Sequence, residues 1–167
     1  MNEGTLAVTN TTGSGTGIGT VTVKPVATLS GTGTISGNVT VESGGFVAPG
    51  VGGIGTLTLE SATLSGTYQC NLDATTCDVL AVGALTVDGT TRITFSGTPA
   101  ANQYIIATYT TMIGSLPAIT PPSGYHLDTA TFGVIQLVKG LNTANSVSFT
   151  LPSGAGRIFI RLVVTPN

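Results

Sequence analysis

The chain has 167 residues, the length of a single domain, of which 41% are hydrophobic and only 7% are charged, with a net charge of −2. Disorder requires low hydrophobicity together with high net charge, so this composition argues against it. Five scattered Lys and Arg residues argue against nucleic acid and anionic membranes as partners, and no apolar run reaches the length of a membrane-spanning helix, so no membrane insertion is expected.

The first expected strand, G-T-L-A-V at residues 4–8, begins almost at once, and no secretory signal precedes it. A tetrapeptide pattern then recurs at a fixed offset. The string V-T-V-K at residues 21–24 returns as V-T-V-E at 39–42 and as L-T-L-E at 57–60, eighteen residues later each time. A period of this size in a chain rich in Gly and Thr is typical of a β-solenoid, in which one repeat forms one coil. The sequence therefore predicts an all-β fold, a parallel β-helix, which the crossover rule expects to be right-handed.

Side-chain alternation assigns the residues of each repeat to two faces. Residues two apart in a strand share a face, so the aliphatic residues should point inward and the threonines between them outward. The expected inward stacks are Val21, Val39 and Leu57; Val23, Val41 and Leu59; and Leu29, Val47 and Leu64.

One polar group of residues follows from the same register. Lys24, Glu42 and Glu60 occupy the same position in successive coils, so stacking would place neighbours about 5 Å apart. Two carboxylates at this spacing could raise the pKa of one of them for acid–base chemistry, or bind Ca²⁺ together with carbonyl oxygens. The alternative is that Lys24 neutralises Glu42 at a solvated corner.

The third repeat contains both cysteines. Residues 56–83 comprise 28 residues, ten more than one coil requires, which predicts an inserted loop around Cys70 and Cys77. With no histidine nearby, the pair falls short of four zinc ligands. We predict a disulfide between the two, which implies an oxidising compartment, and two unpaired thiols are the alternative. The loop is either a stapled recognition loop or a tolerated surface excursion.

After Gly89, bulkier strands separated by turn signals replace the repeat. We expect coils over residues 1–89, and a hairpin-rich C-terminal β cap or small β-sandwich over residues 90–167. The expected strands of the cap are T-R-I-T-F at 91–95, Y-I-I-A-T-Y at 104–109, F-G-V-I-Q-L-V at 132–138, S-V-S-F-T-L at 146–151 and R-I-F-I-R-L-V-V at 157–164.

Candidates for catalysis are few. The single histidine, His126, lies two residues from Asp128, so the two would share a face of a strand, and an imidazole oriented by the carboxylate is conceivable; a structural histidine is the alternative. The chain has no G-x-S-x-G elbow, no Walker loop and no G-x-G-x-x-G leading from a strand into a helix. We therefore expect no enzymatic activity, no cofactor and no metal.

Several segments together resemble a known family. They include G-T-L-A-V, A-T-L-S-G-T-G-T-I-S-G-N-V-T-V, V-A-P-G and G-T-L-T-L, and the stretch from Tyr68 to Gly83 is similar to Y-x-C/V-x-L…D-x-L-x-V-x-G. The chain resembles autotransporter-associated β-strand repeat proteins, well over residues 4–97 and loosely beyond. This resemblance implies export, a right-handed parallel β-helix and a passenger or adhesin-like role, without a shared catalytic site.

The sequence favours a non-enzymatic, exported structural protein of the cell surface or extracellular matrix. We expect copies to associate head-to-tail into a fibre, or the chain to act as an adhesin-like passenger module, with surface glycans as further candidate partners. The competing hypothesis is a glycan-binding or polysaccharide-cleaving module that uses the cysteine loop and the Glu42/Glu60 face, and ice binding by the outward threonines is a third. The candidate self-association strand consists of Arg157, Ile158, Phe159, Ile160, Arg161, Leu162, Val163 and Val164.

Overall fold

The computed structural model describes residues 1–140, and residues 141–167 lie outside the described part of the chain. The described residues form strands and connecting segments, and none of them belongs to a helix that could cross a membrane. The strands are β1 (Gly4–Val8), β2 (Val21–Val23), β3 (Ala27–Gly31), β4 (Thr34–Val41), β5 (Phe46–Pro49), β6 (Thr56–Leu64), β7 (Thr67–Leu72), β8 (Val79–Val87), β9 (Arg92–Gly97), β10 (Gln103–Ile113), β11 (Tyr125–Asp128) and β12 (Val134–Lys139).

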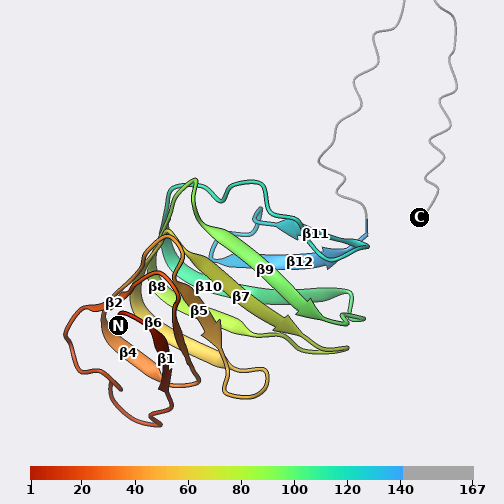
Figure 1. The fold of residues 1–167 in the computed structure, drawn as a ribbon. Coiled ribbons are helices and arrows are strands. Elements are labelled where there is room, and N and C mark those ends of the chain that lie inside the picture. Colours follow the sequence, from red (N-terminus) through yellow and green to blue (C-terminus); the bar gives the residue numbers. More distant parts are fainter. Residues whose placement is uncertain (141–167) are drawn as a thin grey trace, which may run out of the picture.

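These strands stack as about five coils of a β-solenoid (Figure 1). The five-stranded sheet has the order β1-β3-β5-β7-β9, and the seven-stranded sheet has the order β2-β4-β6-β8-β10-β12-β11. Up to β9 and β10, neighbouring strands pair in parallel, because each coil returns the chain to the same sheet one layer further on. The predicted all-β solenoid is therefore confirmed.

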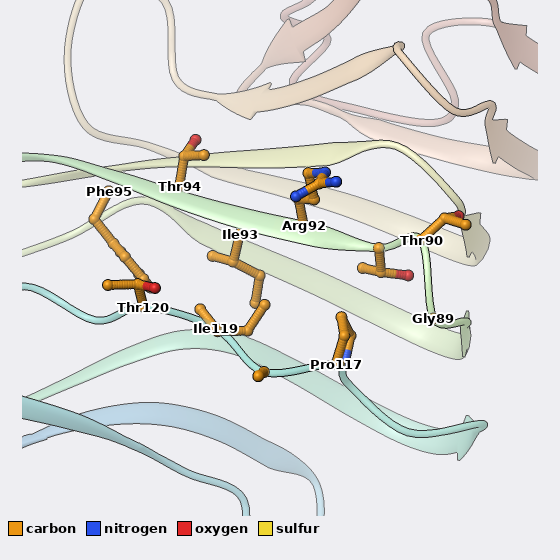
Figure 2. Close-up of a pocket in the computed structure, with 11 residues that line it drawn as sticks. Gly89, Thr90, Arg92, Ile93, Thr94, Phe95, Pro117, Ile119 and Thr120 are labelled. Atoms are coloured by element: carbon orange, nitrogen blue, oxygen red, sulfur yellow. The ribbon is translucent and has the colours of Figure 1, made fainter.

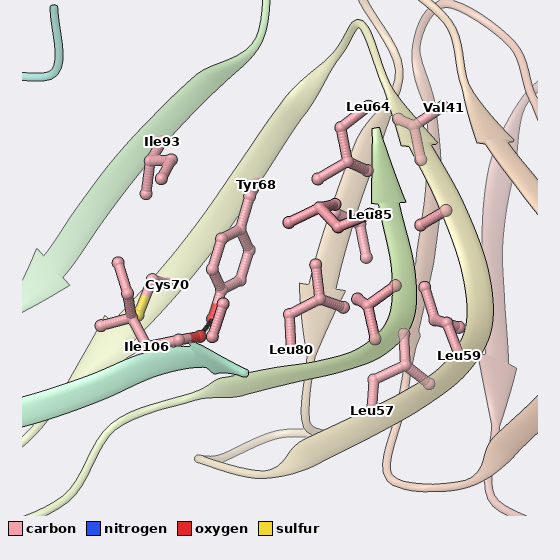
Figure 3. Packing of buried hydrophobic residues seen from close by; sticks show 14 of the residues in the cluster. Val41, Leu57, Leu59, Leu64, Tyr68, Cys70, Leu80, Leu85, Ile93 and Ile106 are labelled. Carbon is pink, nitrogen blue, oxygen red and sulfur yellow. Dashed lines mark hydrogen bonds between the residues drawn. The ribbon is translucent and has the colours of Figure 1, made fainter. Parts of the chain in front are cut away.

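Apolar side chains from both sheets form columns that run along the solenoid. One column consists of Leu29, Val47, Tyr68 and Ile93, which occupy matching positions in β3, β5, β7 and β9. Figure 3 shows how Tyr68 projects into the space between the sheets. Burying a Leu or Val side chain contributes about 1.5–3 kcal/mol, so these columns are the main source of stability.

The alternation of buried and exposed residues slips by one position within β6. Leu57 and Leu59 are buried, whereas the next buried residue, Ala62, follows three positions later. β8 has the same slip between Val82 and Leu85. Since a strand alternates with a period of two, two successive outward residues bend the strand while both halves keep their apolar side chains inward. The seven-stranded sheet is thus divided lengthwise into two halves.

The eighteen-residue register is correct for one coil. Val21 pairs with Val39 across β2 and β4, and Leu29 pairs with Val47 across β3 and β5. Both pairings match the sequence-based expectation, because this coil has the length that the repeated strings suggest.

The register predicted for the next coil is wrong. Val41 pairs with Leu64 rather than with Leu59, and Leu59 pairs with Ile35. The strings V-T-V-E and L-T-L-E look alike but lie in different halves of the bent sheet, so their similarity does not report their place in the coil. The same shift gives Val39 the partner Ala62 in place of Leu57, and Val47 the partner Tyr68 in place of Leu64.

The cysteine segment is not an insertion. Thr56 of β6 pairs with Val79 of β8, an offset of 23 residues, and Val41 and Leu64 in the preceding coil have the same offset. The apparent excess of ten residues arose from taking eighteen as the coil length. The segment forms β7 and the turn that leads into β8.

Parallel stacking also continues past residue 89. β9 pairs with β7, and β10 pairs with β8 as far as Ile113. The predicted boundary between coils and cap therefore lies inside the parallel stack. Within residues 1–140, the hairpin-like part is the pair β11 and β12, of which β12 lies antiparallel on β10.

Candidate functional site

The structure brings together two of the three residues of the predicted charged ladder. Lys24 Nζ lies 2.6 Å from Glu42 Oε1 on the surface. An exposed ion pair of this kind contributes about 0–1 kcal/mol to stability. Glu60 lies at the bend of β6, level with Gly83 of β8, because Leu59 and Ser61 flank it in the register. The predicted stacking of Glu60 on Glu42 is therefore wrong, and the bend in the sheet is the reason.

Glu60 instead lines a shallow groove of about 360 Å³ on the outer face of the seven-stranded sheet. Its neighbours there include Thr34, Thr58, Thr108 and Tyr109. Among residues 1–140, no three His, Cys, Asp or Glu side chains gather where they could hold a metal ion. The groove thus lacks the second carboxylate that the acid–base hypothesis requires.

Both cysteines are buried free thiols, so the predicted disulfide is not formed in this structure. Cys70 Sγ lies 3.6 Å from the carbonyl oxygen of Asp78, and Cys77 Sγ lies 3.2 Å from that of Ile105. The hydrogen bond with the Cys77 thiol and burial raise the pKa of Cys70, which keeps it a neutral thiol. Buried, protonated thiols are poor nucleophiles, so the pair packs in the interior instead of stapling an exposed loop.

Asp78, which the sequence analysis missed, holds this corner together. Its side chain is fully buried, and its carboxylate accepts hydrogen bonds from Gly55 N at 2.8 Å and from Asn71 N and Asn71 Nδ2 at 2.9 Å each. Burial raises the pKa of Asp78, and these three bonds oppose the shift. The sequence carries no local signal for this role, because the donors come from two other segments of the coil.

Tyr68 ties the same corner to the following coils. Its hydroxyl lies 3.0 Å from the carbonyl oxygen of Asp78 and 2.7 Å from that of Ile106, and it donates to these acceptors (Figure 3). Burial is the main cause that raises the pKa of Tyr68. A buried hydroxyl usually requires such partners, so Tyr68, Asp78 and the cysteines form a structural network.

His126 and Asp128 do not act as a pair. His126 Nδ1 lies 3.2 Å from the carbonyl oxygen of Gly140, while the Asp128 carboxylate accepts bonds from Ala130 N and Gln136 Nε2, both at 2.8 Å. The bonds from Ala130 and Gln136 lower the pKa of Asp128. Each side chain therefore has a structural partner in the β11–β12 hairpin.

The most distinctive features are the two ends of the five-stranded sheet. Here an open edge means a strand edge that has no backbone partner within residues 1–140. β1 pairs only with β3, and β9 pairs only with β7, so each has an open edge. In the other sheet, Met1 partly covers β2, since its ammonium group donates to Thr22 O at 2.6 Å and its carbonyl accepts from Lys24 N at 3.0 Å.

The open edge of β9 borders a groove of about 430 Å³ (Figure 2). Ile93 and Phe95 of β9 form one wall, and residues 117–120 form the other, with Ile119 facing Ile93. The candidate self-association strand, 157–164, lies outside the described residues.

In comparisons with known proteins, no family model, no curated protein and no solved structure matched this chain. The functional argument accordingly rests on the geometry described above.

Proposed function

We propose that this chain is a non-enzymatic structural module of the cell surface or extracellular matrix, whose copies associate through the open edges of the solenoid. The observation that carries the proposal is that the five-stranded sheet ends in an open strand at both ends, β1 and β9. An unpaired strand edge presents a row of N–H and C=O groups that pairs readily with another chain.

β1 is the better-suited acceptor for a second copy. Four of its five residues are exposed, and the inward-facing Leu6 retains 37% exposure over the end of the core. The carbonyl of Val8 is directed toward β3, where it accepts from Thr32 N and Gly33 N. Because alternate residues direct their backbone groups to opposite sides, the N–H groups of Thr5 and Ala7 point to the open edge.

The donor in this proposal is the segment 157–164. It is rich in aliphatic residues and carries no acidic residue. It belongs to the C-terminal end of the chain, whereas β1 lies at the N-terminal end of the stack. Donation from one copy to the β1 edge of the next is heterologous, and repeated contacts of this type build a head-to-tail fibre.

The resemblance to autotransporter-associated repeats supports export and a passenger-like role as part of the same proposal. The glycan hypothesis has less support, because Glu60 does not lie beside Glu42 and the cysteine segment is an interior part of an ordinary coil. No specific observation favours ice binding.

Sedimentation velocity over a concentration series, with negative-stain microscopy, tests the proposal. We expect the wild-type protein to form larger, elongated species as concentration rises. Ala7→Pro removes an outward N–H from β1 and should abolish this growth, whereas the control Ala7→Ser keeps the N–H and should leave it intact. Wild-type protein that stays monomeric at high concentration, or Ala7→Pro protein that associates like wild type, would overturn the proposal.

A further inference from the structure

The two sheets differ in length at the C-terminal end of the solenoid. The chain alternates between sheets up to β10, but β11 and β12 both join the seven-stranded sheet. The five-stranded sheet therefore ends two strands earlier, at β9. A strand added there would occupy the layer level with β12.

The edge of β9 has the chemistry that an added strand requires. Arg92 N donates to Gly66 O toward β7 at 3.0 Å, so the backbone groups of Ile93 and Phe95 point to the open edge. The side chains of Ile93 and Phe95 line the groove together with Ile119. A strand in the groove would satisfy the backbone groups and bury apolar side chains against this wall.

The chain path places the following residues at this groove. β12 is antiparallel to β10, so it ends where β10 begins, and Lys139 N donates to Asn102 O at 2.9 Å. Residues 98–102 form the connection from the end of β9 to the start of β10. Residues 141–145 are equally numerous, so they can retrace this corner in the opposite direction.

The sequence after this connection matches the slot. Residues 146–151 read S-V-S-F-T-L, with Val147, Phe149 and Leu151 on one face and Ser146, Ser148 and Thr150 on the other. β9 has the same division, with Ile93 and Phe95 inward and with polar residues such as Thr94 outward. Its six residues also equal the number in the segment.

We propose that residues 146–151 of the same chain add antiparallel to the open edge of β9 as the sixth strand of the five-stranded sheet. Val147, Phe149 and Leu151 then face Ile93, Phe95 and Ile119. The short connection from β12 gives the segment of the same chain a high effective concentration at the groove, which favours it over a segment from a second copy. This inference does not depend on the proposed self-association.

The closure has a consequence for the segment 157–164. Residues 152–156 read P-S-G-A-G, a turn sequence, so the chain can return antiparallel and add 157–164 as a seventh strand. Both sheets would then contain seven strands, and 157–164 would form the outer edge at this end.

Amide hydrogen exchange on the full-length chain tests the closure. Exchange at Ile93 and Phe95 should be at least about tenfold slower than in an unstructured peptide, because both N–H groups would bond to the added strand. The double variant Val147→Ser/Phe149→Ser removes two apolar side chains from the inward face and should abolish this protection. The matched control Ser146→Thr/Ser148→Thr changes the outward face and should preserve it.

Two internal references make the outcome decisive. The amides of Arg92 and Leu59 should stay protected in the double variant, which shows that β9 remains paired with β7 and that the coils remain folded. Unprotected Ile93 and Phe95 in the wild type, or protection that survives in the double variant, would contradict the closure. Protection that falls on tenfold dilution would assign the strand to a second copy and overturn the proposal of closure within one chain.

Discussion

Asp78 shows how much of this fold depends on one side chain in a chain with few charges. Only 7% of the residues are charged, yet this carboxylate lies in the interior and accepts from three donors. Burying a carboxylate is costly unless hydrogen bonds compensate for the lost water. The donors Gly55 and Asn71 come from two separate connections of the coil, so Asp78 fixes the shape of the corner.

Replacing Asp78 should therefore cost stability out of proportion to its size. Asp78→Ala leaves three N–H groups without their acceptor, and we expect the free energy of unfolding to fall by about 3 kcal/mol in urea titrations. Asp73→Ala is the matched control, because Asp73 is exposed and accepts from Thr75 N and Thr76 N within its own turn. We expect that control to cost about 1 kcal/mol. Equal losses for the two variants would show that Asp78 has no special role.

At the scale of the strand, glycine determines where coils can pack closely. Gly97 ends β9 directly over Leu72, with φ at +103°, and a Cβ at this position would lie 1.8 Å from Leu72 O. Gly31 ends β3 over Val8 in the same way, with φ at +129°. Both strands therefore end where only a residue without a side chain fits against the preceding coil.

Gly97→Ala should consequently destabilise the protein by at least about 2 kcal/mol, since it combines left-handed backbone strain with a backbone clash. Gly89→Ala is the appropriate comparison, because a Cβ at Gly89 meets no atom within 4 Å. That substitution should change stability by no more than about 1 kcal/mol. Thermal and urea unfolding of both variants measure the difference, and a Gly97→Ala protein as stable as wild type would contradict the close packing.

Sequence periodicity predicted strands well and their partners only in part. Val21 and Val39 could be aligned because their coil has the length of the repeated string. Leu59 could not, because β6 bends after it, and the bend exchanges the stacking partners of all later residues. Asp78 was missed for a related reason, since its contacts depend on coil lengths that the repeat does not reveal.

At the scale of the whole molecule, the solenoid has ends of different character. The N-terminal end is the short β2, partly covered by Met1, and the exposed β1. The C-terminal end is stepped, with β11 and β12 extending beyond β9. Length, composition and repeats predicted a stacked coil, but the step could not be predicted, because it depends on the reversal of direction between β10 and β12.

This architecture predicts a gradient of local stability along the stack. Each coil contacts only its neighbours, so a terminal coil has one stabilising interface while a central coil has two. We expect amide exchange in β1 to be faster than in β6 and β8, which lie between other strands and carry fully buried leucines such as Leu57 and Leu80. Native-state hydrogen exchange in low denaturant measures this order. Ala62→Gly in the central coil should accelerate exchange in both directions along the stack, whereas Ala7→Gly should affect β1 alone. Identical exchange free energies throughout would show that the protein unfolds as one cooperative unit, without independent coils.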